Sequence, residues 1–119
     1  MDMIEAYKNF FKNYINFDGR TSRSDFWWVV LANILIGIIL PFIGKIIPVL
    51  VSLINILISV YTLAIIIPGF AIGIRRLHDI NKSGWFILLS LIPLVGTIIM
   101  IIFYVQPSVE ENNKYGKIV

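Results

Sequence analysis

The chain has 119 residues, of which 58% are hydrophobic and 14% are charged, and its mean hydropathy is +0.86. Soluble domains contain about 45–50% apolar and about 25% charged residues. The outer faces of a soluble fold also need polar residues at regular intervals, and long stretches of this chain show no such alternation. The composition therefore excludes an ordinary soluble domain and predicts an integral membrane protein.

The net charge is +3, the pI is about 9.3 and the chain contains no cysteine. This charge is too small to indicate nucleic-acid binding, and the basic residues flank apolar runs instead of forming a soluble basic patch. We therefore expect no nucleic-acid partner and an anionic membrane surface instead. The lack of cysteine excludes a disulfide framework, a thiolate nucleophile and cysteine-based zinc or iron–sulfur sites.

Residues 3–16 have the pattern of an amphipathic helix. Apolar side chains recur at helical spacing with polar ones between them: Ile4, Tyr7, Phe10, Phe11, Tyr14 and Ile15 against Asp2, Glu5, Lys8, Asn9, Lys12 and Asn13. Such a helix is expected to lie flat in the headgroup region of a bilayer. Packing against a soluble partner is the alternative.

Three apolar runs follow, at 26–44, 46–74 and 85–105, and none contains Asp, Glu, Lys, Arg or His. About 20 helical residues cross a hydrocarbon core about 30 Å thick. We therefore predict one all-α membrane domain over 1–119, with transmembrane helices at 24–44, 48–77 and 84–105 and a polar tail at 106–119. Pro68 and Gly69 predict a kink in the second helix, because proline lacks a backbone donor and clashes with the preceding turn.

Three crossings would place the N-terminus and the 75–84 connector on one side of the membrane and the C-terminal tail on the other. The first side carries seven basic residues and the second three: Lys8, Lys12, Arg20, Arg23, Arg75, Arg76 and Lys82 against Lys45, Lys114 and Lys117. The positive-inside rule then makes the first side cytoplasmic, and tryptophans prefer the same interface. Four crossings with both termini inside is the alternative topology, but the chain has no fourth apolar run.

Two polar segments meet at this interface, "GRTSRSDFWW" (19–28) and "RRLHDINKSGW" (75–85). Arg75 and Asp79 are four residues apart, so if the helix of the second span continues through them they face the same side and can pair. Ser22 and Asp25 have the spacing of a capping box at the start of the first span. Ser83 is expected to cap the third span.

These segments carry a resemblance to a known family. "GRTSRSDFWW", "RRLHDINKSGW", the following Pro93-x-x-Gly96 and the terminal "NNKYG" resemble domain of unknown function 805, a family of small bacterial inner-membrane proteins. The resemblance covers about residues 16 to 116 and implies a multi-pass helical protein of the bacterial inner (plasma) membrane. It implies no activity, so no catalytic residues are carried over.

The polar segments form a cytoplasmic surface that is rich in Arg, Asp and Trp. Free N–H groups at the start of two helices, next to arginines, have the chemistry of a phosphate site. The hypothesis is a site for an anionic lipid headgroup or another phosphorylated ligand, formed by Arg20, Arg23, Arg75, Arg76, Lys82 and Ser83, with Asp18, Asp25, His78 and Asp79 as orienting or structural partners and Trp27, Trp28 and Trp85 as interface anchors. The alternative is that these charges pair with one another and fix the packing of the helices.

Catalysis, metal binding and coupled transport are less well supported by the sequence. His78 and Asp79 point about 100° apart on a helix and no nucleophile motif accompanies them, so we expect no catalytic residues and no enzyme. One histidine with scattered aspartates predicts no metal site, and no cofactor is expected. Coupled carriers place ionisable groups inside the membrane. Here the polar residues within the apolar runs are uncharged ones such as Asn55 and Ser59, which are suited to contacts between helices.

The sequence therefore predicts a non-enzymatic organising or accessory subunit that binds anionic lipid or a partner membrane protein through its cytoplasmic polar surface. Self-association or contact with a partner membrane protein is expected because three spans bury only a small core. A subunit of a small oligomeric channel or transporter is the alternative, and a membrane enzyme acting on a phosphorylated lipid is the third hypothesis.

Overall fold

The computed structural model describes residues 2–110, 113–116 and 118–119, and the molecule measures 55 × 31 × 21 Å along its principal axes. The described residues form helices and contain no β-strand, only one isolated bridge between Arg20 and Ile118. The elements in chain order are α1 (Met3–Lys12), α2 (Arg23–Ile46), the 3₁₀ helix η1 (Pro48–Leu50), α3 (Val51–Ala64), α4 (Ile66–Asp79), the 3₁₀ helix η2 (Gly84–Leu91) and α5 (Val95–Tyr104).

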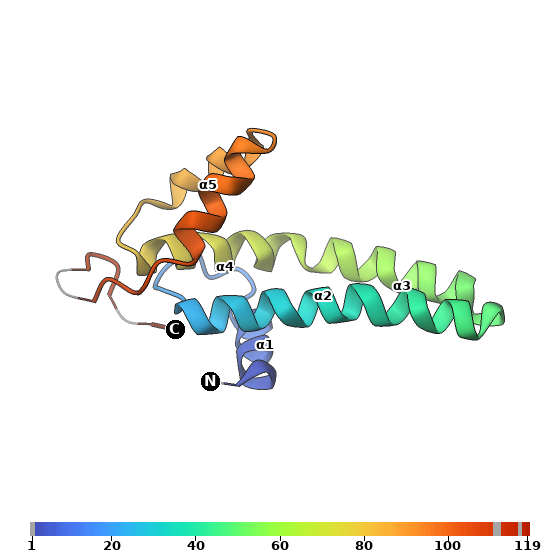
Figure 1. Ribbon diagram of the computed structural model, residues 1–119. Coiled ribbons are helices and arrows are strands. Elements are labelled where there is room, and N and C mark those ends of the chain that lie inside the picture. Colours follow the sequence, from blue (N-terminus) through green and yellow to red (C-terminus); the bar gives the residue numbers. More distant parts are fainter. Residues whose placement is uncertain (1, 111–112, 117) are drawn as a thin grey trace.

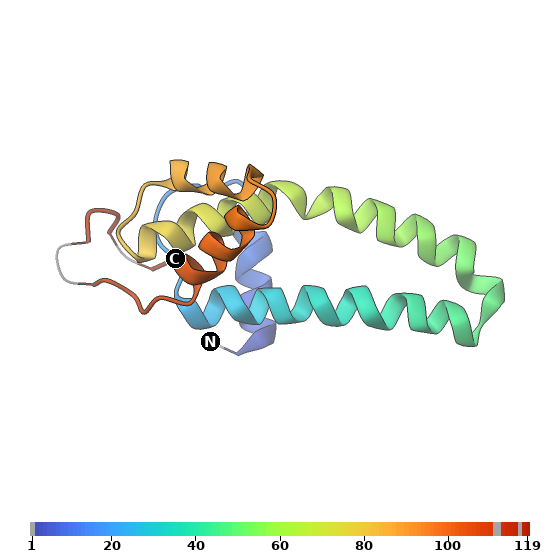
Figure 2. The same ribbon diagram turned by 45° about the horizontal axis from the view of Figure 1, so that its top comes forward.

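A long helical hairpin forms the body of the molecule. α2 runs away from the termini, η1 turns the chain at the far tip, and α3 and α4 return beside α2 (Figure 1). Ser22 caps α2 as expected, because its hydroxyl accepts a hydrogen bond from the Asp25 N–H at 3.3 Å. Both termini lie at the end opposite the tip (Figure 2). We call this end, with the 13–22 loop, residues 75–83 and the C-terminal tail, the polar end.

The predicted second helix is broken into α3 and α4, which meet at an angle of 42°. The break lies at Ile65, one turn before the predicted site at Pro68 and Gly69. The cause is the expected one, because Pro68 cannot donate to the Ala64 carbonyl and its ring clashes with that carbonyl. The kink is therefore confirmed and its position is corrected by three residues.

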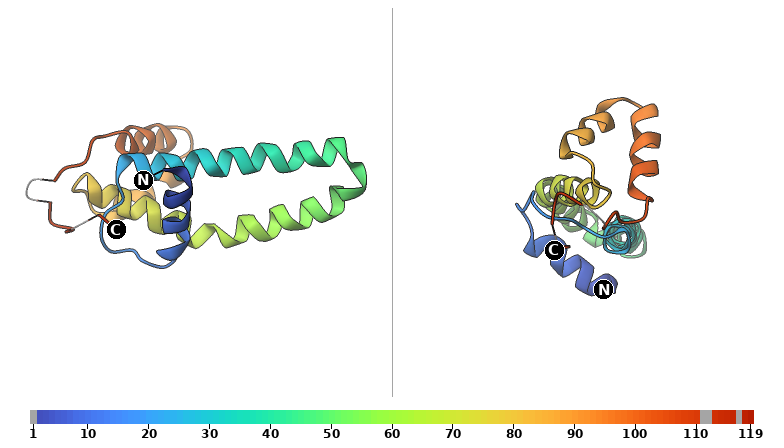
Figure 3. Two further views of the ribbon diagram at one scale, coloured as in Figure 1. Left: turned by 90° about the horizontal axis from the view of Figure 1, so that it is seen from below. Right: turned by 90° about the vertical axis from the view of Figure 1, so that its left-hand side faces the viewer.

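The prediction of one continuous helix over 84–105 is wrong. The chain forms η2, turns at 92–94 and returns as α5, so these apolar residues make a short hairpin packed beside α4 (Figure 3). Leu94 has a positive φ of 61° inside this turn, and the Val95 N–H bonds to the Pro93 carbonyl at 2.7 Å. A Cβ at Gly96 would lie 1.9 Å from the Leu89 carbonyl oxygen, so only glycine allows this close return. The C-terminal tail consequently lies at the polar end, not at the opposite end as three crossings would require.

The amphipathic helix α1 is shorter than predicted, ending at Lys12 instead of residue 16, and it crosses α2 and α4 at a steep angle (Figure 1). Ala6 and Phe10 are 2% exposed and pack with Phe26 and Val29 of α2 and Ile72 of α4. Part of its apolar face is thus covered by its own chain, whereas Ile4 and Phe11 remain exposed and its charged residues point outward.

The outer faces of the hairpin remain apolar and exposed. Ile38 of α2 is 62% exposed and Leu63 of α3 is 71% exposed. Among the described helices, α2 alone is long and apolar enough to cross a membrane by itself. η1–α3 and α4 together are long and apolar enough to cross it as one bent span. α5 is apolar but shorter, so length and composition support one crossing, or two if the bent pair is one span, and the predicted three are not confirmed.

Candidate functional site

Arg75 occupies the centre of the polar end and is 1% exposed. Its Nε donates to the Thr21 hydroxyl at 3.0 Å, and one terminal nitrogen donates to the carbonyl oxygens of Asn13 and Asn16 at 3.1 and 2.7 Å. The Arg75 carbonyl in turn accepts from the Thr21 N–H at 3.0 Å. Because the last turn of α4 holds the loop between α1 and α2 in this way, Arg75 fixes α1 against the hairpin.

Arg76 and Asp79 form a second, fully buried group. A terminal nitrogen of Arg76 lies 2.8 Å from Asp79 Oδ2. The other nitrogens of Arg76 donate to the carbonyl oxygens of Tyr104, at 3.1 Å, and Gln106. The predicted ion pair between Arg75 and Asp79 is therefore wrong: Asp79 pairs with the arginine three residues before it, and Arg75 turns toward the 13–22 loop.

Arg20 joins this group from the other side and links it to the C-terminal tail. Its terminal nitrogen lies 3.2 Å from Asp79 Oδ1 and donates to the Val109 carbonyl at 3.1 Å. The Asp79 carboxylate also accepts from the Ser108 hydroxyl, and the Asp79 carbonyl accepts from the Val109 N–H at 2.8 Å. Two arginines thus share one buried carboxylate, and the tail closes over all three.

His78 lies beside this group without touching Asp79 through its ring. Its Nδ1 is 2.9 Å from the Gly19 carbonyl oxygen, and the ring stacks on Tyr115 with centroids 3.9 Å apart. His78 and Asp79 therefore contact different partners, and the structure does not bring them together as an acid–base dyad. No group of three or more His, Cys, Asp or Glu suited to a metal ion occurs within the described residues.

The remaining charged residues of the predicted site lie nearer the surface or apart. Arg23 is exposed and donates to the Val105 carbonyl at 3.1 Å. Lys82 is half-buried, with its Nζ 5.3 Å from the centre of the Phe103 ring. Asp18 is exposed and pairs with no arginine in the described part of the chain. Asp25 is buried, and its Oδ1 has no hydrogen-bond partner among those residues.

The predicted capping serine and anchor tryptophans are placed as follows. Ser83 caps η2 by accepting from the Trp85 N–H at 3.3 Å, as expected. Trp27 is half-buried and donates to the Tyr104 carbonyl at 3.0 Å, so it ties α2 to α5. Trp28 is 36% exposed and Trp85 is 78% exposed. The structure thus assigns one of the three indoles to packing and leaves the other two free to meet lipid.

Sequence reasoning missed the part played by the C-terminal tail. Asn113 donates to the His78 carbonyl at 2.9 Å, and Tyr115 stacks on the His78 ring. Both residues belong to the "NNKYG" segment that the family resemblance pointed to. The resemblance was therefore the one signal that the tail and the "RRLHD" segment belong together. Lys117, which was counted among the three basic residues of the second side of the membrane, lies outside the described residues.

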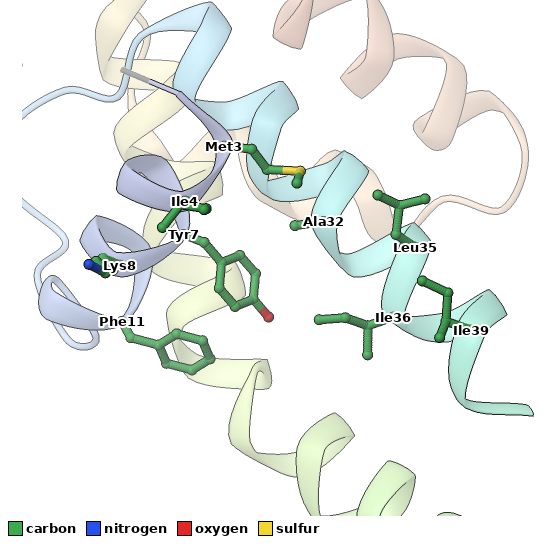
Figure 4. A pocket seen from close by; sticks show the side chains of 9 residues that line it. All are labelled: Met3, Ile4, Tyr7, Lys8, Phe11, Ala32, Leu35, Ile36 and Ile39. Carbon is green, nitrogen blue, oxygen red and sulfur yellow. The ribbon is translucent and has the colours of Figure 1, made fainter. Parts of the chain in front are cut away.

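A separate apolar groove of about 550 Å³ lies between α1 and α2. Tyr7 and Phe11 of α1 face Ile36 of α2 across it, and Lys8 lies on the outer side of α1 (Figure 4). Lys8 is the one charged residue among those that line the groove. Next to the groove, Asn33 of α2 accepts from the Tyr7 hydroxyl at 2.9 Å and from the Tyr61 hydroxyl, and so ties α1, α2 and α3 together.

The exposed apolar helices and the buried, internally paired charges at one end define a helical membrane protein. The chain belongs to the family described as "Protein of unknown function (DUF805)", whose model matches residues 14–117. This finding confirms the resemblance drawn from the polar segments, and it covers α2 to α5 and the tail.

Two relatives from Escherichia coli (strain K12) place the chain in the bacterial inner membrane. Inner membrane protein YhaH is 34% identical over 114 residues, which make up 95% of this chain and 94% of that protein. Inner membrane protein YhaI is 34% identical over 113 residues, which make up 95% of this chain and 93% of that protein. No solved structure matches the chain.

Proposed function

We propose that this chain is a non-enzymatic accessory subunit of the inner membrane that contacts anionic lipid at the rim of its polar end. The proposal rests chiefly on the use of Arg75 and Arg76. Their guanidinium groups are buried and donate to backbone carbonyls, Thr21 and Asp79. Charges arranged in this way fix a structure, and they are not free to bind a substrate.

The rim of the polar end supplies the groups that remain available. Arg23 and Trp28 at the start of α2 and Trp85 at the start of η2 are exposed. Indole rings favour the membrane interface, and arginine binds phosphate oxygens through paired donors. This combination favours contact with a lipid headgroup. The ligand set proposed from the sequence is therefore narrowed to exposed members such as Arg23.

The same proposal places the polar end in the cytoplasm, with α2 and α3–α4 as the two crossings. The basic residues of the described chain divide unequally between the two ends of the hairpin. Lys8 and Lys12 lie on α1, Arg23 begins α2, and the polar end carries Arg20, Arg75, Arg76, Lys82 and Lys114, whereas only Lys45 lies next to the tip. The positive-inside rule favours the basic end as the cytoplasmic one.

Impermeant thiol labelling tests this topology directly because the chain has no cysteine of its own. Single cysteines at the exposed positions Asp18, Lys45 and Lys114 serve as reporters. In intact cells, Lys45→Cys should react from outside, whereas Asp18→Cys and Lys114→Cys should react only after the membrane is opened. Labelling of 18 and 114 from opposite faces would contradict the proposal, because η2–α5 would then have to cross.

The lipid contact is tested by mass spectrometry of lipids that co-purify in a gentle detergent. One basic residue near a membrane surface contributes about 1 kcal/mol, so Arg23→Gln should lower bound anionic lipid by about fivefold. Lys45→Gln makes the same charge change at the tip and serves as the matched control. Equal lipid content in folded wild type and Arg23→Gln would remove the proposed contact.

A further inference from the structure

A pocket of about 330 Å³ opens beside His78, between the end of α4, the start of η2 and the C-terminal tail. Its lining includes His78, Ser83, Trp85 and Tyr115. Small-ligand sites usually measure about 300–1,000 Å³, so this pocket has room for a headgroup and not for a whole lipid. Neither the ion pairs nor the helix packing described above uses it.

His78 presents an unused acceptor to this pocket. The residue is 8% exposed, and its Nδ1 lies 2.9 Å from the Gly19 carbonyl oxygen. A carbonyl oxygen only accepts, so Nδ1 carries the proton and, in the neutral ring, Nε2 has a free lone pair. Nε2 has no hydrogen-bond partner among residues 2–110, 113–116 and 118–119. Nε2 is not one of the fully buried unpaired atoms, so it is open to the pocket, where a donor on a bound molecule can reach it.

Gly84 keeps this acceptor open. A Cβ at Gly84 would lie 3.5 Å from His78 Nε2 and 2.7 Å from Ile74 Cγ2. Gly84 also lines the pocket, so Nε2 faces the space beside it. The glycine of the "SGW" segment therefore lets η2 approach α4 closely while leaving the imidazole nitrogen uncovered.

The surroundings of the pocket indicate the chemistry of its ligand. Trp85 is 78% exposed and Leu88 is 53% exposed, so the wall formed by η2 presents apolar side chains to the outside of the molecule. Among the described residues, none that lines the pocket is acidic, and Lys114 Nζ lies 5.6 Å from the centre of the Tyr115 ring. These features disfavour an ammonium group and favour a headgroup with a negative phosphate and a hydroxyl donor.

We propose that this pocket binds the glycerol headgroup of an anionic phospholipid, with a headgroup hydroxyl donating to His78 Nε2. The side chains of Trp85 and Tyr115 line the glycerol, and the phosphate stays outside the pocket. This inference rests on the proposed lipid contact and refines it, because it adds recognition of a hydroxyl group to the attraction of charge at Arg23.

The test compares two lipids of equal charge. Phosphatidylglycerol carries headgroup hydroxyls and phosphatidylmethanol carries none, so the wild-type chain is placed in phosphatidylcholine nanodiscs with one or the other. The chain has a single histidine, and ¹⁵N-histidine NMR therefore reports one ring. Phosphatidylglycerol should shift the Nε2 resonance, and mass spectrometry should find it retained about three- to tenfold over phosphatidylmethanol, the effect of one net hydrogen bond.

Two variants of His78 separate its two nitrogens. The amide nitrogen of His78→Asn can still donate to Gly19, but this side chain has no atom at the Nε2 position, so the preference for phosphatidylglycerol should disappear. His78→Gln places an amide oxygen near the Nε2 position and should keep part of the preference. Circular dichroism checks that both variants fold. If either does not, the comparison of the two lipids with the wild-type chain still tests whether the pocket recognises a hydroxyl group.

Three outcomes would overturn the inference. Equal retention of phosphatidylglycerol and phosphatidylmethanol would exclude hydroxyl recognition, while leaving the charge contact at Arg23 intact. A stronger response to phosphatidylethanolamine would make the donor an ammonium group. A full Nε2 shift with soluble glycerol 3-phosphate, and none with phosphatidylglycerol, would replace the lipid by a soluble ligand.

Discussion

At the polar end, Arg75, Arg76 and Asp79 are at most 1% exposed, whereas on the outer faces of the hairpin Val60 and Leu63 are 61% and 71% exposed. A soluble protein distributes these residue types in the opposite way. The hairpin is stable with apolar faces outward because lipid surrounds it, and its backbone groups are satisfied within each helix. The polar end has irregular loops, and the buried arginines supply the donors that those loop carbonyls need.

This difference means that the two regions should respond differently to the same kind of change. At the polar end one charge serves several partners, so its loss leaves other charges buried and unpaired. On the outer faces of the hairpin, an apolar side chain contacts lipid both in the folded protein and after the helices separate within the membrane. Its loss therefore changes the free energy of unfolding little. The following variants are ordered by expected effect.

Asp79→Asn should be the most damaging, because it leaves Arg76 and Arg20 buried without their shared carboxylate. Removing one partner of a buried pair costs about 3–5 kcal/mol in free energy of unfolding. Thermal unfolding in detergent, followed by tryptophan fluorescence, measures the loss. Asp18→Asn removes the same charge at an exposed position and should change the unfolding free energy by less than about 0.5 kcal/mol. Similar values for the two variants would show that Asp79 is not the centre of the polar end.

Gly96→Ala should follow, because its Cβ would meet the Leu89 carbonyl oxygen at 1.9 Å and the backbone of the η2–α5 turn would have to move. Forced shifts of this kind cost about 1–3 kcal/mol. Gly37→Ala on α2 is the matched control, since no atom lies within 4 Å of its added Cβ. Near-equal unfolding temperatures for the two alanine variants would argue against the turn, and in favour of a continuous helix through residue 96.

Tyr61→Phe should have the smallest effect of the three. It removes one of the two hydroxyls that donate to Asn33 and leaves the bond from Tyr7 in place. Hydrogen bonds between membrane helices contribute about 0.6 kcal/mol on average. A loss well above about 2 kcal/mol would mean that the hairpin, like the polar end, depends on its polar contacts.

Local signals in the sequence were sufficient for much of the fold. The spacing of Tyr7, Phe10 and their neighbours predicted α1, the Ser22–Asp25 cap predicted the start of α2, and Pro68 predicted the break between α3 and α4. Each of these features depends on residues within one or two turns of each other. The spacing of residues along the sequence is therefore enough to predict where these helices begin and break.

The failures came from contacts between distant segments. The run at 85–105 has the length of a span, and only the approach of Gly96 to Leu89 shows that Pro93 and Gly96 make a turn. The i,i+4 spacing allowed Arg75 to pair with Asp79, but Asn13, Asn16 and Thr21 compete for the same guanidinium group. Helical spacing shows which side chains share a face, and tertiary packing decides which of them meet.

The narrow tip formed by η1 has a consequence for biogenesis. In the proposed orientation, the only part of the described chain that must be translocated is the short turn near Lys45, since both termini and the residues around Asp79 stay on the side of synthesis. Lysine costs about 2.5–3.5 kcal/mol on insertion scales at the centre of a spanning helix, and Lys45 next to the tip costs less, so the apolar flanks of α2 and α3 offset it. The two helices can therefore enter the bilayer together as a preformed pair, before the tail is synthesised and closes over the arginines.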